Sequence, residues 1–458
     1  MFLSAEHDTL RMKWGLLFFL ILASSVLGIH ASTSTVNYYA ALQGGYVVVG
    51  TTVAYYNNSF STSLTVYSLN GTLIETRVLP DADLLQLTTA DSTLFGLALA
   101  NGSLIVFVAS LPSLSGEVYS LPYSLTSFLP SEAGVQLLDL GTYTRTLVSL
   151  VGRFLITFTS IFNDGERRLN VSVRDLLSGT VANSLTVPSN RSFLVDGTSL
   201  VILNGDGAFI YSLLPSPREV ISLANATFAG GGPPMVFVQG NTTLLFDGKG
   251  NELGSLPGQY QYLAAYEKNG SYTIALAPVG SRPTFQTPTT IILLTLNGSS
   301  SASVIVAPLP LQAVFVDGRL FGLYVSSSGL IVRSLEYNIS SNISSILNPT
   351  GPVELGEIDG YLMVASEVRS PEPFSTSLPF TATVIYSVSN LTPVAYVPYP
   401  LLPVAVMGGK VLLAGQRLLL SPLPYFPRGG GPSLFPLFPI LIVTPLAVLT
   451  YFLYRKRG

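Results

Sequence analysis

Short apolar runs separated by small polar residues fill the chain from about residue 36 to residue 423. Runs such as 46–49, 104–108, 201–203 and 411–413 are β-branched or otherwise apolar, and Gly, Asn, Asp or Ser bounds each of them. This is the pattern of β-strands joined by turns. No window of a dozen residues places its apolar positions at a 3.6-residue period, so helices are not predicted here. The pattern predicts an all-β domain.

A hairpin signal recurs along this domain. In Asp196-Gly197 and Asp317-Gly318 two turn residues separate two apolar runs, and such pairs favour type I′ turns because both central positions need a positive φ. The same signal appears at Gly44-Gly45, Asp91-Ser92, Gly152-Arg153, Asn269-Gly270, Asp359-Gly360 and Gly408-Gly409, with a weaker copy at 230–232. The interval between signals is about 45 residues, the length of a four-stranded propeller blade.

On this period and hairpin chemistry, residues 36–423 resemble the β-propeller ectodomains of archaeal-type, membrane-anchored surface proteins. The resemblance implies a β-propeller of seven to nine blades. We expect eight, with one of the nine signals either lacking a blade of its own or belonging to a shared closing blade. No Trp-Asp pair and no Asp-box is present to name a propeller family. The alternative is a pair of β-sandwiches in tandem.

Both ends of the chain carry targeting features. Residues 434–454 are 21 residues without a charge, and Arg455, Lys456 and Arg457 follow at once. About 20 apolar residues cross a membrane as a helix, and basic residues after the span mark the cytoplasmic side. We expect a transmembrane helix at 434–454 and a cytoplasmic tail at 455–458. The protein is then a single-pass protein of the cell membrane, with its N-terminal domain outside.

Residues 1–31 have the features of a secretion signal, with Arg11 and Lys13 before an apolar run and small residues after it. The alternative is an uncleaved N-terminal anchor. The extracellular propeller then occupies 32–423. A Pro- and Gly-rich stalk at 424–433 leads to the membrane.

Composition excludes several classes of function. Between residues 32 and 433 there are 17 Lys and Arg against 23 Asp and Glu, which does not suit nucleic acid. Cysteine is absent, and His7 and His30 both lie in the N-terminal segment. The mature domain therefore has no histidine or cysteine for nucleophilic catalysis or zinc binding. We predict a protein that is not an enzyme and that has no catalytic residues, no cofactor and no bound metal.

Acceptor sequences for N-glycosylation, Asn-x-Ser/Thr, include twelve of the nineteen asparagines. They are meaningful only in a secreted context such as this one, and we expect several to carry glycans. The twelve are Asn57, Asn70, Asn101, Asn170, Asn190, Asn225, Asn241, Asn269, Asn297, Asn338, Asn342 and Asn390.

Two other kinds of site have weaker support. The segment 247–252 matches a calcium loop only in part, because Lys249 stands where an oxygen ligand belongs. Carboxylates such as Glu357, Asp359 and Glu166 would allow hydrolysis of the glycosidase type without histidine. We treat these residues as turn or surface residues first.

These observations favour a non-catalytic, N-glycosylated cell-surface protein that binds a partner or forms part of the envelope. Envelope proteins and glycans are its expected partners. One alternative is a surface hydrolase with a carboxylate site in the propeller channel. Another is an extracytoplasmic accessory subunit of a transporter or sensor.

The longer connections predict a binding face. They fall between the second and third strands of their repeats, at 56–63, 161–168, 279–289 and 369–380, with Phe285, Phe374 and Phe380 as candidate contact residues. The last repeat has only three strands, and we expect 34–39 to supply its outer strand. The chain would then leave on the side of the tight turns, which would face the membrane.

Overall fold

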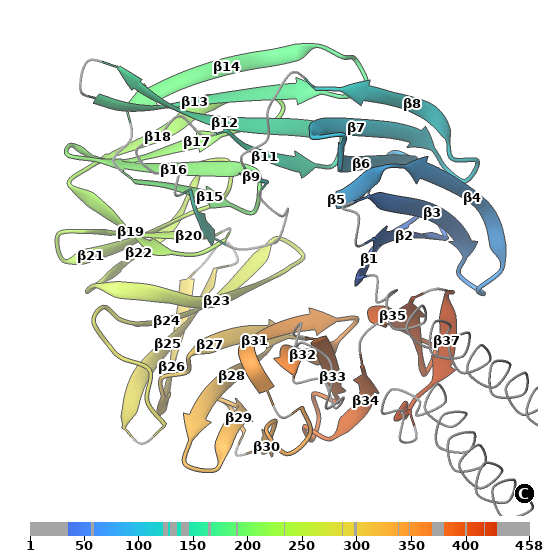
Figure 1. Cartoon of the computed structure of the whole chain (residues 1–458). Helices are drawn as coiled ribbons and strands as arrows, with labels where there is room; N and C mark the ends of the chain where they lie inside the picture. The colour runs from blue at the N-terminus through green and yellow to red at the C-terminus, as the bar shows by residue number, and fades with distance from the viewer. Residues whose placement is uncertain are drawn as a thin grey trace, which may run out of the picture. The chain divides into compact units, whose positions relative to one another are not determined.

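The structure is a computed structural model, and its regular elements are β-strands (Figure 1). It describes residues 35–55, 59–121, 127–128, 135–138, 146–163, 166–188, 191–232, 234–285, 287–296, 300–337, 339–347, 349–368, 380–398, 401–415 and 417–427. Within these ranges no helix has the length and apolar character needed to span a bilayer. The predicted signal and transmembrane segments, 1–31 and 434–454, lie outside them.

The strands form nine sheets of mainly antiparallel strands, and the chain is an all-β protein of the β-propeller class. We number the sheets as blades 1 to 9 in chain order. The chain divides within blade 3 into two compact units, which are described separately.

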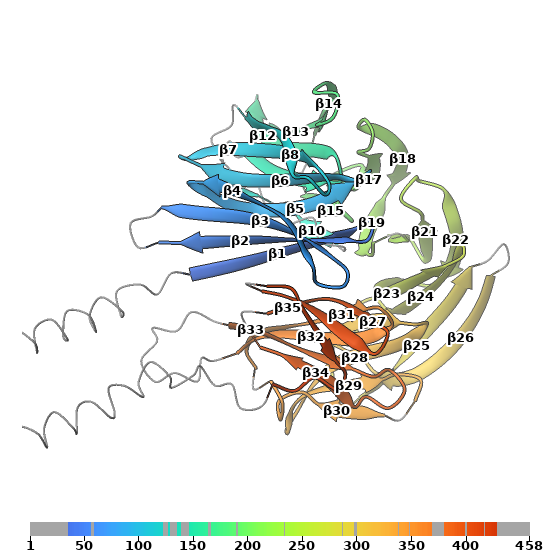
Figure 2. The same cartoon turned by 90° about the vertical axis from the view of Figure 1, so that its right-hand side faces the viewer.

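The first unit contains blades 1 and 2 and most of blade 3. In Figure 2 the strands of blade 1 lie in the order β1 to β4. The three blades comprise β1 (Thr35–Gln43), β2 (Tyr46–Ala54), β3 (Phe60–Ser68) and β4 (Leu73–Pro80); β5 (Ala82–Ala90), β6 (Thr93–Ala100), β7 (Ser103–Ser110) and β8 (Ser115–Ser120); and β9 (Ser127–Phe128), β11 (Thr146–Val151), β12 (Phe154–Asn163), β13 (Glu166–Asp175) and β14 (Val181–Pro188).

The second unit contains blades 4 to 9. Blades 4 to 6 comprise β10 (Val135–Leu137), β15 (Arg191–Val195), β16 (Ser199–Asn204), β17 (Gly207–Ser212) and β18 (Arg218–Ala224); β19 (Ala226–Gly230), β20 (Met235–Gln239), β21 (Thr242–Phe246) and β22 (Glu252–Pro257); and β23 (Tyr260–Lys268), β24 (Ser271–Pro278), β25 (Pro288–Leu296) and β26 (Ser300–Pro308). Blades 7 to 9 comprise β27 (Gln312–Val316), β28 (Arg319–Ser326), β29 (Gly329–Ser334) and β30 (Ser340–Asn342); β31 (Pro349–Ile358), β32 (Tyr361–Val368), β33 (Phe380–Tyr386) and β34 (Pro393–Val397); and β35 (Leu402–Met407), β36 (Lys410–Ala414) and β37 (Leu419–Pro422).

Every predicted hairpin signal joins the first two long strands of a blade. At the turn of blade 7, for instance, Asp317 and Gly318 have φ of 47° and 76°, and at that of blade 8 Asp359 and Gly360 have 46° and 77°. These values suit the turn residues that the sequence places there. The expected range of seven to nine blades is confirmed, but the preferred number of eight is wrong, because all nine signals mark a blade.

The chain between β8 of blade 2 and β11 of blade 3 adds two strands that the sequence analysis missed. β9 pairs in parallel with β11, and β10 pairs antiparallel with β15. Blades 3 and 4 therefore have five strands each, and in both the added strand lies beside the first strand of the blade. The added strands are two and three residues long, too short for a periodic pattern to reveal them.

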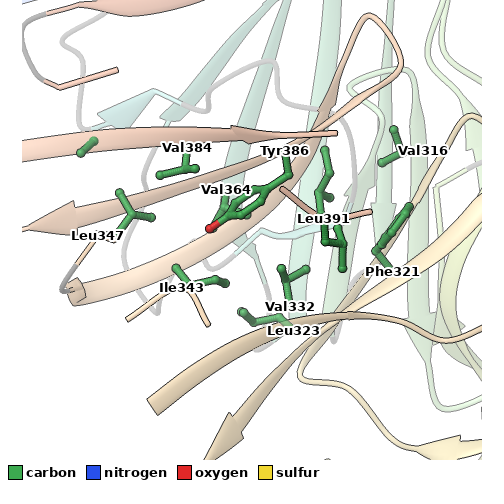
Figure 3. Close-up of a cluster of buried hydrophobic side chains, with 12 residues drawn as sticks. Val316, Phe321, Leu323, Val332, Ile343, Leu347, Val364, Val384, Tyr386 and Leu391 are labelled. Atoms are coloured by element: carbon green, nitrogen blue, oxygen red, sulfur yellow. The ribbon is translucent and has the colours of Figure 1, made fainter. Parts of the chain in front are cut away.

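The core consists of apolar side chains packed between neighbouring blades. Between blades 7 and 8, Phe321 and Val332 pack with Val364, Val384 and Tyr386, all buried (Figure 3). Burying each side chain of this size stabilises the fold by about 1.5–3 kcal/mol. Along the second unit, the first strand of each blade from β19 to β31 also contacts the first strand of the blade that follows. Consecutive blades are thus held together by side-chain clusters between them and by contacts between their first strands.

The predicted outer strand of the last blade is wrong. Residues from Thr35 onward form β1, which pairs with β2 as the first strand of blade 1. Blade 9 contains three strands, all drawn from the C-terminal end of the described chain. The hairpin turn at Gly44-Gly45 explains the error. This turn needs a strand before it, and residues 35–43 supply that strand.

After β37 the chain turns back along blade 8. The N–H of Leu423 donates to the carbonyl oxygen of Gly409, in the tight turn of blade 9, at 2.9 Å. Tyr425 then forms a parallel bridge with Ala395 of β34, and β34 runs toward the end of blade 8 at which β32 and β33 connect. β37 thus ends on the tight-turn side, as the sequence analysis expects, and the chain then runs beside β34 at Tyr425. The residues by which it leaves the domain, from 428 on, lie outside the described ranges. Part of the segment assigned to the stalk lies against a blade.

Candidate binding groove

A groove of about 590 Å³ opens between blades 5 and 6 of the second unit. Its walls come from β19, from the connections that precede β19 and β23, and from those that follow β20 and β24. Within each blade these connections occur at one end, opposite the Asp-Gly-type turns. Among the residues that line the groove are Asn225, Thr227, Phe228, Gln259, Gln261 and Val279.

Local sequence explains how the groove is built. Asn225 is the single residue between β18 and β19, and its φ of 54° lies in the left-handed region that asparagine tolerates better than most residues. Its N–H donates to the carbonyl oxygen of Asp206 at 3.1 Å. Gly240 and Gly258, with φ of 59° and 105°, make the neighbouring connections.

The apolar part of the groove comes from Ala229, Val238 and Val279. Phe228 is half-buried, and its ring packs at an angle against those of Phe193 and Phe237, with both centroid distances 5.2 Å. Phe237 in turn meets Phe246 edge-on at 5.9 Å. Because Phe193 belongs to blade 4, the ring of Phe228 lies in the core between blades 4 and 5, on the other face of β19 from Thr227 and Ala229.

Amide and hydroxyl groups form its polar part. Nε2 of Gln259 donates to the carbonyl oxygen of Gly240 at 2.7 Å, and Nε2 of Gln261 donates to that of Ser281 at 3.4 Å. Within the described residues nothing donates to Oε1 of either glutamine, so these oxygens are free to accept hydrogen bonds. The hydroxyl of Thr227 donates to the carbonyl oxygen of Val238 at 3.4 Å.

No side chain that lines the groove is charged or titrates near neutral pH. The groove therefore offers no general acid or base and no counter-ion for a charged ligand. Aliphatic side chains beside amide oxygens suit a neutral ligand with apolar and hydroxyl-bearing faces. Its volume is within the range of about 300–1,000 Å³ that is usual for small-molecule sites.

The predicted glycosylation sites fall into two groups where the structure describes them. Six of the asparagines are exposed and lie on turns or single-residue connections: Asn70, Asn101, Asn225, Asn241, Asn269 and Asn390. Asn170 in β13 and Asn342 in β30 are half-buried within strands. Asn57, Asn190, Asn297 and Asn338 lie outside the described residues. Of the described acceptor asparagines, Asn225 lines the groove, and Asn241 follows Gly240 at its rim.

Phe285, one of the contact residues predicted on the long connections, packs against a neighbouring blade. The ring of Phe285 meets that of the buried Tyr324 edge-on at 5.8 Å, so it holds the connection 279–287 against blade 7. Phe380 begins β33, and Phe374 lies outside the described residues. The predicted long connection 161–168 is wrong, because β12 ends at Asn163 and β13 begins at Glu166.

The carboxylates considered for calcium binding or hydrolysis either accept backbone hydrogen bonds or lie singly on the surface. The carboxylate of Asp247 accepts hydrogen bonds from the N–H groups of Lys249 and Asn251, at 2.9 and 2.7 Å, as in an Asx turn. Oδ2 of Asp359 accepts from the N–H of Val406 at 2.6 Å, and Glu357 is exposed on β31. No group of three or more His, Cys, Asp or Glu residues that could hold a metal occurs in the part of the chain that the structure describes.

Comparisons with known proteins give no family. No family model and no curated protein matches the chain. A solved structure described as the eukaryotic initiation factor aligns at 12% identity and a TM-score of 0.41, covering 80% of this chain and 87% of that one. The β-propeller domain of the Trilobed protease from Pyrococcus furiosus aligns at 12% identity and a TM-score of 0.34, covering 77% and 93%.

A third solved structure is the acylaminoacyl peptidase of Pyrococcus horikoshii, at 11% identity and a TM-score of 0.36. The alignment covers 80% of this chain and 52% of the peptidase, so the chain spans about half the length of that enzyme. None of these similarities assigns an activity to this chain.

Proposed function

We propose that this chain is a non-catalytic, N-glycosylated surface protein that is held to a membrane by residues 434–454. It binds neutral carbohydrate through the groove between blades 5 and 6. The observation that carries the proposal is the lining of that groove, where Val238 and Val279 lie with the amides of Gln259 and Gln261 and no charged side chain is present. Sugar rings have apolar CH faces for the valine side chains and hydroxyl groups for the amide oxygens.

The distribution of carboxylates supports binding over hydrolysis. Glycosidase chemistry needs two carboxyl groups about 5–9.5 Å apart across one pocket. The groove has none, Asp359 accepts a backbone hydrogen bond, and Glu166 is exposed and pairs with Arg168 at 3.5 Å. The sequence also offers no histidine or cysteine between residues 32 and 458.

A glycan array tests the proposal. The full chain, purified in detergent from a host that does not N-glycosylate, should bind one or more neutral oligosaccharides. Gln259→Ala should weaken that binding about tenfold, since it removes a hydrogen-bond acceptor worth about 1 kcal/mol or more. Gln239→Ala is the matched control, because Gln239 makes a similar amide bond to the carbonyl oxygen of Ala224 at 2.7 Å but does not line the groove.

Binding that both variants leave unchanged would place the carbohydrate elsewhere. Failure to bind any neutral oligosaccharide would contradict the proposal, provided the purified chain shows a cooperative thermal transition. Turnover of a bound oligosaccharide would contradict its non-catalytic part.

A further inference from the structure

We infer that an N-glycan attached at Asn225 lies in this groove and closes it to other carbohydrates. The inference rests on the proposed function, because it assumes that the groove accepts sugars. It adds that the chain's own modification decides whether the groove is open to ligands from outside.

The position of the acceptor residue carries the inference. The side chain of Asn225 is exposed and itself lines the groove. Thr227, the hydroxyl residue of the same Asn-Ala-Thr sequence, is exposed and lines it too. A sugar joined to Nδ2 of Asn225 therefore starts at the wall of the groove. Val238 and Gln259, which also line the groove, offer the next surface.

The covalent link makes even weak packing sufficient. A group held by a short flexible tether has an effective concentration on the order of millimolar. An attached sugar whose dissociation constant is well below that value occupies the groove most of the time. A free oligosaccharide of the same affinity has to displace it and binds correspondingly less well.

Other acceptor asparagines of the same unit lack this geometry. Asn241 is exposed at the rim, next to Gly240, but its side chain does not line the groove. Asn269 lies on the tight turn between β23 and β24, at the opposite end of blade 6 from the groove. Its φ of 54° and the following Gly270 make the turn of an Asn-Gly hairpin. Asn269→Asp keeps a residue suited to that turn while removing the acceptor, which provides a control.

The test uses the full chain from a host that N-glycosylates and compares wild type with Thr227→Ala, Thr227→Ser and Asn269→Asp. Thr227→Ala removes the acceptor sequence and leaves Asn225 in place, whereas Thr227→Ser keeps both the sequence and a hydroxyl. Glycopeptide mass spectrometry reports occupancy of Asn225. The binding probe is the oligosaccharide released from the glycosylated chain itself and labelled with a fluorophore.

We expect Asn225 to be modified in wild type, Thr227→Ser and Asn269→Asp. The probe should bind Thr227→Ala at least tenfold more tightly than it binds the other three. A bare Asn225 in wild type would overturn the inference, and so would equal binding by wild type and Thr227→Ala. Absence of binding to all four would overturn it as well. The array with the unmodified chain then shows separately whether the groove binds sugars at all.

Discussion

The N–H of Tyr396, in the outer strand of blade 8, donates a hydrogen bond of 2.8 Å to the carbonyl oxygen of Tyr425. The N–H of Tyr425 returns a bond of 2.9 Å to Val394. Leu423 and Tyr425 also pack against the apolar cluster between blades 8 and 9. The segment that leads toward the predicted transmembrane helix is therefore held along a blade edge before it departs.

This pairing predicts where the chain can be cut. A chain ending at Pro427 should fold as the full chain does. A chain ending at Leu423 loses both hydrogen bonds and the packing of Tyr425, and should be less stable by about 1–3 kcal/mol. Urea unfolding followed by far-ultraviolet circular dichroism measures the difference. Equal midpoints for the two truncations would show that the pairing contributes nothing.

A buried glutamine makes a second prediction, in the first unit. Gln86 of β5 is 6% exposed. Its Nε2 donates to the carbonyl oxygen of Leu150 and its Oε1 accepts from the N–H of Leu150, both at 2.9 Å. Gln86→Leu leaves two buried backbone groups of β11 without partners, at about 1–3 kcal/mol each.

The free energy of unfolding of Gln86→Leu should therefore fall by roughly 2–5 kcal/mol. Gln239→Leu is the control, because its single bond to Ala224 is exposed to solvent, and it should change stability by less than about 1 kcal/mol. A small effect of Gln86→Leu, similar to that of the control, would mean that the two blades do not depend on this bond.

Alkaline pH should destabilise the fold through buried tyrosines. Burial raises the pKa of Tyr324 from 10.0 to about 12, and its hydroxyl donates to the carbonyl oxygen of Pro308 at 3.0 Å. Below pH 10 both folded and unfolded chains keep the proton, so this stability is fully present. Between pH 10 and 12 the unfolded chain ionises first, and stability falls.

Burial also raises to about 12 the pKa of Tyr39, Tyr211, Tyr262 and Tyr386. Tyr324→Phe should lose about 1 kcal/mol at pH 7, because one hydrogen bond is missing, but its stability should decline less steeply than that of wild type between pH 10 and 12. Parallel declines in a pH series of urea denaturation would contradict the assignment.

Asp83 should affect stability at neutral pH. Burial raises the pKa of this carboxyl group above 3.8, so the folded chain binds its proton more tightly than the unfolded chain does. The favourable contribution is complete below pH 3.8 and is lost as pH rises through the folded pKa. Asp83→Asn should therefore be at least as stable as wild type at pH 7, and the difference should change in favour of wild type on acidification. A variant that is clearly less stable at pH 7 would contradict this.

The repeat structure is predictable from sequence because it depends on local chemistry. Asp317-Gly318 and Asp359-Gly360 can adopt positive φ at low cost, and the apolar runs on both sides have the length of strands. Both features are visible within about ten residues. The count of nine blades also follows from these signals, once none is discounted.

Features that depend on distant pairing are not predictable in this way. The short strands β9 and β10 exist only because β11 and β15 offer them an edge, and Tyr425 meets Ala395 of β34, 30 positions earlier in the chain. The groove was missed for the same reason. Thr227 and Gln259 are 32 positions apart, and each alone has the features of an ordinary strand or turn residue.

Site-by-site occupancy of the acceptor asparagines in the protein from its native membrane tests the account of a glycosylated surface protein most directly. Glycopeptide mass spectrometry should find glycans on most of the six exposed turn positions, including Asn70, Asn225 and Asn390. The two half-buried strand positions should be bare: Asn170, and Asn342, whose Nδ2 donates to the carbonyl oxygen of Ser328 at 3.3 Å. Unmodified asparagine at all six turn positions would contradict the account.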